Sequence, residues 1–269
     1  MQSFTEDSRM TWLLSDADML LHKTVASCER EIEWMPNVIT THILVSEAQQ
    51  MFQELVAKLQ RQAKASRITL CWTAESNFRL KVDSTYKGNR RGTLHRRKPV
   101  GYKAMRQWAE QAFPSECWYD LEGDDVLGIL ATRHPDETVI WSGDKDLMQI
   151  PGAHLNDAGE IETVSQLQAD AFFYRQILTG DTTDGYPGCP GCGKVSAAKL
   201  VPEEGFTEAT AWGAVVKQFE KKHLGADYAL RQARLARILR DSEYQLDELQ
   251  LWTPPTIQYD QATTGAAKT

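Results

Sequence analysis

Groups of acidic residues follow several short apolar runs in this sequence of 269 residues. A single such acid can be explained by the dipole and the unpaired N–H groups at a helix N-terminus. Three acids within four residues, as in "LEGDD", repel one another unless a cation relieves the repulsion. The candidate metal ligands are Asp16, Glu122, Asp124, Asp125, Asp144, Asp146, Asp181 and Asp184.

These carboxylates have no histidine or thiolate partners that would complete a zinc site. Hard oxygen ligands of this kind favour Mg²⁺ or Mn²⁺ over zinc. Two such ions about 4 Å apart can activate a water molecule and stabilise the leaving oxygen of a phosphodiester. The residues therefore predict phosphodiester hydrolysis with two Mg²⁺ ions, for which Mn²⁺ can substitute.

The stretch "TGDTTDGYPGCPGCGKVSAAKL", residues 179–200, places two of these acids directly before a glycine-rich turn and a basic helix. Glycines allow the backbone to turn sharply, so that consecutive N–H groups and a helix N-terminus can face one phosphate. We therefore predict that this segment holds the backbone of a nucleic acid. The predicted contacts are Gly188, Gly191, Gly193, Lys194 and Lys199.

Two cysteines in the same turn, in "CPGC", match the spacing of a zinc knuckle or a redox centre. Neither a second pair nor a nearby histidine completes such a site, so we favour inward packing of Cys189 and Cys192. The five cysteines of the chain are irregularly spaced, which argues against a disulfide framework. We expect reduced thiols.

A basic stretch from Arg79 to Arg106 holds ten Lys or Arg residues and one acid, Asp83. The net charge of the chain is -7, but a phosphate responds to the local field and not to the total charge. The alternative interpretation is a solvated basic loop without a ligand. If the stretch has a ligand, its charge predicts a polyanion such as a nucleic acid.

Short apolar runs alternate with amphipathic helical stretches in the first part of the chain. We expect strands at 11–15, 67–72, about 116–120 and 138–142, and a helix from about Thr40 to Ala65. This alternation predicts an α/β fold with a mainly parallel central sheet and helices on both faces. Because the loops at the carboxyl ends of such strands meet in one crevice, the acids should converge in space.

Helical patterns dominate beyond about residue 165, and the tail "QATTGAAKT" lacks large apolar residues. We predict an α/β core over 1–173, a helical region over 174–252 and a disordered tail over 253–269. The composition, 42% hydrophobic and 25% charged, is that of a globular protein. No apolar run approaches the length of a membrane span, and the first residues lack a signal-peptide pattern, so we expect a cytoplasmic protein.

Four stretches, in this order, resemble the 5′-nuclease superfamily of flap endonucleases and the 5′-exonuclease domains of bacterial DNA polymerases. They are "FRLKVDSTYKGNR", "LEGDDVLG", "SGDKDLMQIPG" and the glycine-rich stretch quoted above. In addition, "YKGNRRGTLHRRKPVGY", "GDTTDGYPG" and "ARILRDSEYQLDELQLW" are similar to the T7-type 5′–3′ exonucleases of bacteriophages. The resemblance runs from about Leu13 to Trp252, and the order and spacing of the motifs make it specific.

The resemblance implies an active site bridged by a helical arch, here residues 79–106, and a helix-three-turn-helix that binds duplex DNA. It implies that Lys87 and Arg79 contact the scissile phosphate and that Tyr86 stacks on the terminal base. Packing of Tyr86 against the arch is the alternative. The eight candidate ligands fall on metal-site positions of the family, and its glycine turn also holds a monovalent cation, commonly potassium. Further implied DNA contacts in the arch are Arg90 and Arg91.

The sequence departs from the family pattern at two places. Relatives usually carry an Asp in the loop after the second strand, where this chain has Ala74 followed by Glu75. Glu75 is the candidate replacement for that metal contact. Relatives also often carry a Lys two residues after the last glycine of the turn, where this chain has Val195. The phosphate contact is then expected from Lys194.

The combined pattern predicts a metal-dependent 5′–3′ exonuclease, or structure-specific 5′ nuclease, that acts on duplex DNA with a 5′ end, nick or flap. The RNA of RNA/DNA hybrids is a further candidate substrate, and we expect a monomer in the host cytoplasm. One alternative is a DNA-binding protein of the same fold without catalytic activity. Another is a haloacid dehalogenase-type phosphatase, suggested by "DADML" and "GDKD", although Leu20 stands where that chemistry usually has Thr or Val.

Overall fold

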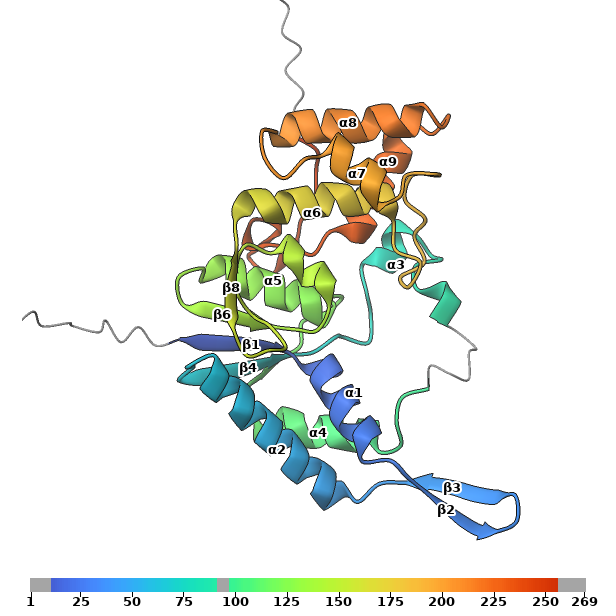
Figure 1. The fold of residues 1–269 in the computed structure, drawn as a ribbon, viewed down its shortest axis with the longest axis vertical. Helices are drawn as coiled ribbons and strands as arrows, with labels where there is room; N and C mark the ends of the chain where they lie inside the picture. Colours follow the sequence, from blue (N-terminus) through green and yellow to red (C-terminus); the bar gives the residue numbers. More distant parts are fainter. Residues whose placement is uncertain (1–10, 91–96, 256–269) are drawn as a thin grey trace, which may run out of the picture.

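A six-stranded sheet with the order β5-β4-β1-β6-β7-β8 forms the centre of the protein (Figure 1). The computed structural model describes residues 11–90 and 97–255. β1 pairs in parallel with β4 and β6, whereas β8 pairs antiparallel with β7. The predicted mainly parallel α/β sheet is therefore confirmed. The strands are β1 (Trp12–Asp16), β4 (Arg67–Cys71), β5 (Ser115–Glu116), β6 (Thr138–Trp141), β7 (Gly152–Leu155) and β8 (Ile161–Val164).

Helices cover both faces of this sheet (Figure 1). Successive side chains of a strand point to opposite faces, and in β1 the neighbours Leu13 and Leu14 belong to different cores. Leu13 packs with three helices on one face, and Leu14 packs with one helix on the other. The three helices are α1 (Ala17–Ser27), α2 (Val45–Gln62) and α4 (Tyr102–Ala112), and the single helix is α5 (Gly123–Arg133).

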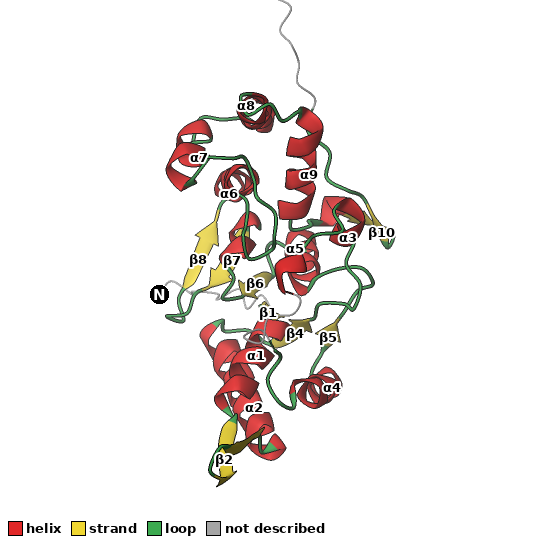
Figure 2. Cartoon of the chain, turned by 90° about the vertical axis from the view of Figure 1, so that its right-hand side faces the viewer, coloured by secondary structure: helices red, strands yellow, loops and turns green. Residues whose placement is uncertain are grey.

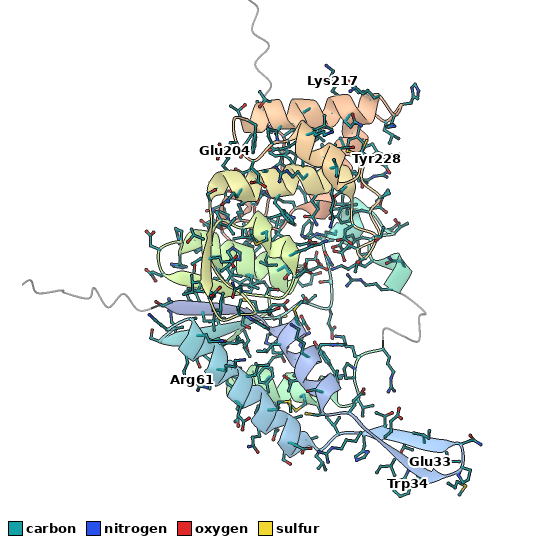
Figure 3. The ribbon with its side chains drawn as sticks, viewed as in Figure 1. Glu33, Trp34, Arg61, Glu204, Lys217 and Tyr228 are labelled. Carbon is teal, nitrogen blue, oxygen red and sulfur yellow. The ribbon has the colours of Figure 1, made fainter. Side chains whose placement is uncertain are left out.

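The helix expected from Thr40 begins instead at Val45, because the preceding residues form a hairpin. β-branched residues in "VITT" favour a strand, and Asn37 at the turn has a φ of 67°, which Asn tolerates well. The hairpin projects from the body of the molecule, with Trp34 65% exposed near its tip (Figures 1 and 3). Its strands are β2 (Arg30–Met35) and β3 (Val38–His42).

A second group of helices stacks above the sheet, as Figure 2 shows. The boundary predicted between residues 173 and 174 falls inside the first of these helices, whose residues Phe173 and Ile177 share one core. Cys189 and Cys192 are buried in the same core as free thiols, in agreement with the predicted inward packing. The helices are α6 (Gln166–Thr179), α7 (Lys194–Leu200), α8 (Glu208–Glu220) and α9 (Ala226–Ala236).

Short elements connect the two groups of helices and complete the described chain. Of the strand expected at 116–120, only Glu116 belongs to β5, and the residues after it form a turn. Among the described helices, none combines the length and the apolar character needed to span a bilayer. The short elements are α3 (Arg79–Val82), β9 (Tyr244–Gln245), β10 (Glu248–Leu249) and 3-10 helices at Gly88–Arg90, Lys145–Gln149 and Asp241–Glu243.

Candidate active site

The carboxyl edge of the sheet forms an acidic cavity of about 170 Å³. Asp16 is the last residue of β1, Asp144 follows β6, and Glu122 precedes the first turn of α5. The structure therefore brings most of the candidate ligands together, as expected from the ends of parallel strands. The acids that line the cavity are Asp16, Asp18, Glu122, Asp124, Asp144, Asp146 and Asp184.

A serine fixes the relative positions of the acids at the ends of β1 and β6. Ser142 Oγ donates to Asp16 Oδ2 at 3.0 Å and accepts from Asp144 N at 3.0 Å. Asp16 also caps α1, because its Oδ1 accepts from Met19 N at 3.0 Å. Asp144 Oδ1 in turn accepts from Asp146 N at 2.9 Å. These bonds hold the carboxylates in place against their mutual repulsion.

Burial and mutual repulsion raise the pKa of several acids in the cavity. Burial, together with the charges of Asp18 and Asp144, raises the pKa of Asp16 to about 6. Burial and the charge of Asp144 raise the pKa of Asp146 to about 6. Burial and the charges of Asp16 and Asp144 raise the pKa of Asp124 well above its usual range. A cation among these groups would favour their ionised forms.

The donor set of the cavity suits a hard cation that keeps part of its water shell. Asp146 Oδ1 is buried and has no hydrogen-bond partner within residues 11–90 and 97–255. Within the same residues, no three acid, histidine or cysteine side chains are grouped so as to hold one ion. An open carboxylate oxygen suits Mg²⁺, which usually takes one or two carboxylates and keeps several waters.

Lys87 and Tyr86 reach the cavity from the segment after α3. Lys87 Nζ lies 2.5 Å from Glu122 Oε1 and 3.6 Å from Asp184 Oδ2. The Tyr86 hydroxyl lies 3.0 Å from Asp184 Oδ2 and 3.2 Å from Glu122 Oε2. Because Tyr86 is only 4% exposed, its ring packs in the helical core and does not offer a face to a DNA base. The placement agrees with the packing alternative and not with base stacking.

Arg79 and Asp125 pair with each other in the core. Arg79 Nη1 and Nη2 donate to the two carboxylate oxygens of Asp125 at 2.7 and 2.8 Å. Arg79 Nε donates to Leu235 O at 3.0 Å, and Nη2 also donates to Arg237 O. Arg79 is 2% exposed and Asp125 is 0% exposed. The guanidinium and the carboxylate are buried and bind each other. This placement contradicts the expected phosphate contact of Arg79 and the expected metal contact of Asp125.

The predicted arch is joined at its base to the loop after α6. Arg90 pairs with Asp184, and its Nε donates to Thr183 O at 3.1 Å. The neighbouring Asn89 donates from Nδ2 to Thr182 O at 2.6 Å. The two segments are thus fastened together beside the acidic cavity, although they are far apart in the sequence.

Asp181 lies in a neighbouring cavity of about 610 Å³ and not in the acidic one. Its Oδ1 accepts from Thr183 N at 2.6 Å, which orders the loop. Gly193 and Lys194 line the same cavity. Asp146 lines both cavities, so the two cavities adjoin at this side chain.

The glycines of the turn have two different environments. Gly188 has a φ of 64°, and a Cβ at this position would come within 2.3 Å of Gly180 N. Its N–H donates to Gln232 Oε1 at 2.9 Å in the interior, so it does not face a phosphate as expected. Gly191 and Gly193 are exposed, and a Cβ at either position would meet no atom closer than 3.7 Å.

The other predicted DNA contacts of the turn lie on the surface of α7. Lys194 and Lys199 are exposed, and Val195, where relatives often carry a Lys, is 72% exposed. An exposed apolar side chain therefore lies between two lysines in the sequence of α7. Arg91 of the predicted arch lies outside the described residues.

Glu75 does not line the acidic cavity. It is exposed and lines a third cavity, of about 1060 Å³, beside α4. Two lysines line the same cavity, Lys98 and Lys103. The structure therefore places the candidate replacement for the missing acid at Ala74 outside the acidic cavity, in a cavity that it shares with Asp18.

Asp18 belongs to the acids expected to meet at the strand ends, but it is not among the eight candidate metal ligands. It lines both the acidic cavity and the cavity beside α4. Its Oδ2 accepts from Thr73 N at 2.8 Å, and its Oδ1 accepts from the Tyr102 hydroxyl at 2.6 Å. The available signal was its spacing, because an acid two residues after Asp16 falls in the first turn of α1. Asp18 thus brings a carboxylate next to Ala74.

Comparisons with known proteins agree with this arrangement. The family described as "5'-3' exonuclease, N-terminal resolvase-like domain" matches residues 11–173. The chain is 28% identical to an exodeoxyribonuclease of Enterobacteria phage T3, over 90% of this chain and 92% of that protein. It is 27% identical to an exonuclease of Escherichia phage T7, over 90% of this chain and 93% of that protein. The expected relation to T7-type exonucleases is confirmed.

Solved structures show the same fold at lower sequence identity. The 5′-exonuclease of T5, with bound zinc, superposes with a TM-score of 0.62 and 15% identity. That match covers 84% of this chain and 89% of the T5 protein. A T5 flap endonuclease in a pseudo-enzyme-product complex with DNA and metal ions superposes with a TM-score of 0.59 and 16% identity, over 84% of this chain and 88% of that one. The chain therefore belongs to the 5′–3′ exonuclease family.

Proposed function

We propose that the chain removes nucleotides from the 5′ end of duplex DNA by hydrolysis that depends on Mg²⁺ in the acidic cavity. The observation that carries the proposal is the meeting of acids from four separate segments in one cavity that Lys87 and Arg90 also line. Family membership supports the reaction class. Two bound Mg²⁺ ions, or Mn²⁺ in their place, would supply an activated water and stabilise the charge on the leaving oxygen.

Carboxylates on two sides of the cavity are the proposed metal ligands. Those at the ends of β1 and β6 are held by backbone bonds and a serine, so they keep their positions without a cation. Asp181 would act from the neighbouring cavity across Asp146. The proposed ligands of the acidic cavity are Asp16, Asp124, Asp144 and Asp146 on one side, and Glu122 and Asp184 on the other.

Lys87 is the proposed cation that stabilises the scissile phosphate. Its side chain is 25% exposed and lies between Glu122 and Asp184, so it can exchange a carboxylate for a phosphate oxygen without leaving the cavity. A donor held at this point favours charge that develops in the transition state. Arg90, with its side chain 38% exposed, is the proposed contact to the next phosphate. Arg79 and Tyr86 would act indirectly, by holding the acids and the base of the arch.

The duplex would be held by the loop after α6 and by α7, in what we propose to be the helix-three-turn-helix. Gly191 and Gly193 are exposed and would offer their backbone N–H groups to a phosphate, and Lys194 and Lys199 add positive charge. Gly188 supports this turn from inside, because any side chain there would collide with Gly180. A monovalent cation, commonly potassium, at the same turn is part of the proposal.

Further parts of the proposal concern the substrate range and the state of the protein. We include nicks and flaps as substrates, because each offers a 5′ end beside a duplex. We also include the RNA strand of RNA/DNA hybrids. The proposed active form is a monomer that works in the host cytoplasm. Family membership favours this nuclease over the phosphatase alternative.

End-labelled DNA tests the proposal directly. Duplexes that carry the label at the 5′ or the 3′ end are incubated with the full chain, with Mg²⁺ or with EDTA. We expect the 5′ label to leave first, and only with Mg²⁺. An Asp124→Asn variant is the matched control, because it removes one charge from the cavity and keeps the shape of the side chain. Its release of label should fall at least about a hundredfold.

Two outcomes would contradict the proposal. Release of the 3′ label first would show the opposite polarity of degradation. Binding of the duplex without Mg²⁺-dependent release would favour the alternative of a DNA-binding protein without catalytic activity.

A further inference from the structure

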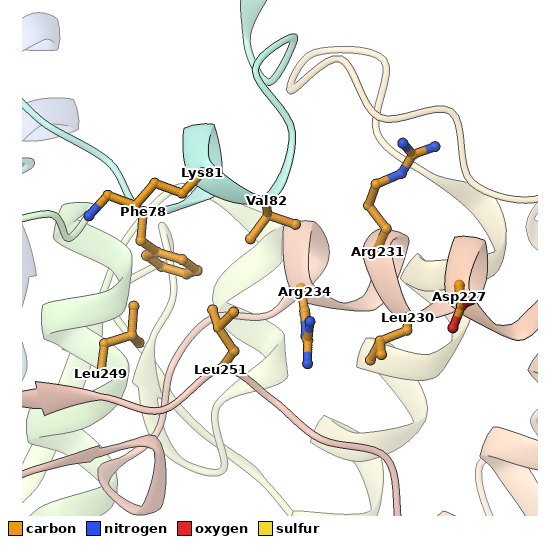
Figure 4. A pocket seen from close by; sticks show the side chains of 9 residues that line it. All are labelled: Phe78, Lys81, Val82, Asp227, Leu230, Arg231, Arg234, Leu249 and Leu251. Carbon is orange, nitrogen blue, oxygen red and sulfur yellow. The ribbon is translucent and has the colours of Figure 1, made fainter.

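A groove of about 440 Å³ lies between α3, α9 and the segment that contains β10 (Figure 4). Figure 4 shows Phe78 and Val82 on one side of the groove and Leu249 and Leu251 on the other. Leu230 of α9 completes the apolar lining. A volume of this size and an apolar lining are typical of a ligand site.

The groove follows the seam between two hydrophobic cores. Leu230 packs against the core of the helical region, whereas Leu249 and Leu251 pack against the core beside α5. Val82 packs against both cores. A ligand in the groove would therefore contact two parts of the protein at once.

Charged side chains at the groove are mostly cationic. Lys81, Arg231 and Arg234 line it together with one acid, Asp227. The side chain of Lys81 is 72% exposed and that of Arg231 is 43% exposed. Lys81 pairs with Asp120, and Arg231 lies near Asp83. A solvated cation can exchange such a partner for a ligand carboxylate at little cost. Positive charge thus surrounds an apolar lining.

We propose that this groove docks a partner protein through a short acidic segment that carries one or two large apolar side chains. The apolar side chains would fill the space between Phe78 and Leu251, and the flanking carboxylates would meet Lys81 and Arg231. A nucleic-acid strand is less suited, because its bases stack on exposed aromatic faces, whereas the aromatic ring of the lining, Phe78, is 3% exposed. The proposal does not depend on nuclease activity.

The position of the groove gives such a partner access to the active site. Phe78 and Lys81 flank Arg79, whose guanidinium holds Asp125 in the core. The next part of the same segment carries Lys87 to the acidic cavity. A partner bound to α3 would therefore contact the base of the predicted arch and leave the acidic cavity open.

Fluorescence anisotropy with a defined probe tests the docking site. The probe is a fluorescein-labelled peptide, Asp-Asp-Phe-Glu-Asp-Leu, titrated with the full chain in the absence of DNA. We expect saturable binding that Leu230→Asp and Arg231→Glu each weaken about tenfold or more. Lys217→Glu makes the same charge change on the exposed side of α8 and should leave the affinity within about twofold (Figure 3). Thermal melting of each variant shows whether it is folded, and Leu249→Asp serves if Leu230→Asp does not fold.

Three outcomes would overturn the proposal. One is the absence of saturable binding, and another is binding that the groove variants do not change. A third is a probe with both apolar residues replaced by serine that binds as tightly as the original. If the groove variants weaken binding of a labelled thymidine oligonucleotide but not of the peptide, the groove is a nucleic-acid surface and the proposal is wrong.

Discussion

The pair formed by Arg79 and Asp125 should contribute strongly to the stability of the protein, and Arg79→Met is the change that tests it. This substitution keeps an apolar chain of similar length but leaves the Asp125 carboxylate, which is 0% exposed, without a cation and with only the backbone N–H groups of Glu122 and Leu239 as donors. An uncompensated buried charge costs about 3–5 kcal/mol. The carbonyls of Leu235 and Arg237 also lose their donor, which adds to the cost. We expect the free energy of unfolding to fall by about 4 kcal/mol or more.

Urea unfolding followed by circular dichroism measures this loss against a matched control. Arg133 pairs with Asp241 through an Nε to Oδ1 distance of 2.7 Å, but the two side chains are 39% and 34% exposed. Arg133→Met removes the same type of interaction where water replaces it, so it should cost about 0–1 kcal/mol. The difference between the two variants measures the cost of leaving the buried carboxylate and the two carbonyls without Arg79.

Arg79→Lys separates this stabilising role from a direct role at the phosphate. A lysine keeps the positive charge but cannot donate to both oxygens of Asp125 and to two carbonyls at once. We expect it to lose much of the stability that the methionine variant loses. The reasoning is refuted if Arg79→Met costs no more than Arg133→Met, or if Arg79→Lys is as stable as the parent and only its cleavage rate falls.

The remaining predictions concern the acidic cavity. Asp144→Asn should abolish cleavage in Mg²⁺ while duplex binding, measured by filter retention, stays within about tenfold; cleavage near the parent rate would remove Asp144 from the site. Lys87→Ala should lower the single-turnover rate about a hundredfold or more, and a change in binding alone would make Lys87 an ordinary phosphate contact. Asp18→Asn should raise the Mg²⁺ concentration needed for half-maximal cleavage more than Glu75→Ala does, because Asp18 lines the cavity and Glu75 does not; the reverse order would restore Glu75 as the replacement acid. The pKa of Asp16, about 6, lies above that of an unfolded Asp, so its contribution to stability falls as pH rises from about 4 to about 7. Mg²⁺ should therefore raise the Tm more at pH about 7.5 than at pH about 5, and equal shifts would contradict the assignment.

The positions of Asp16 and Asp144 could be predicted because strand ends are visible in the sequence. Each follows an apolar run, and the carboxyl ends of parallel strands share one edge of the sheet. The roles of Asp124 and Asp125 could not be separated in the same way. Adjacent helix residues point about 100° apart, and only the position of Arg79 decides which one faces the core.

The burial of Arg79 and Gly188 could not be predicted, because both depend on distant parts of the chain. Arg79 is held by carbonyls of α9 and the segment after it, and Gly188 N donates to Gln232 of α9. Sequence patterns show a basic stretch and a glycine turn, but they do not show which of these groups a distant helix covers. The hairpin before α2 differs from the expected helix for a local reason, because the turn at Asn37 outweighs the helical pattern that follows.

The pairing of β1 on both of its edges has a consequence for synthesis on the ribosome. β1 pairs first with β4, whose last residue is Cys71, and its other edge pairs with β6, which begins at Thr138. At about 5–20 residues per second, the ribosome needs on the order of 3 to 13 seconds to make the chain between these two points. During that time the second edge of β1 presents unpaired backbone groups to any other nascent strand. Slower elongation would lengthen this interval, so the yield of folded protein should depend on the rate of translation between Cys71 and Thr138.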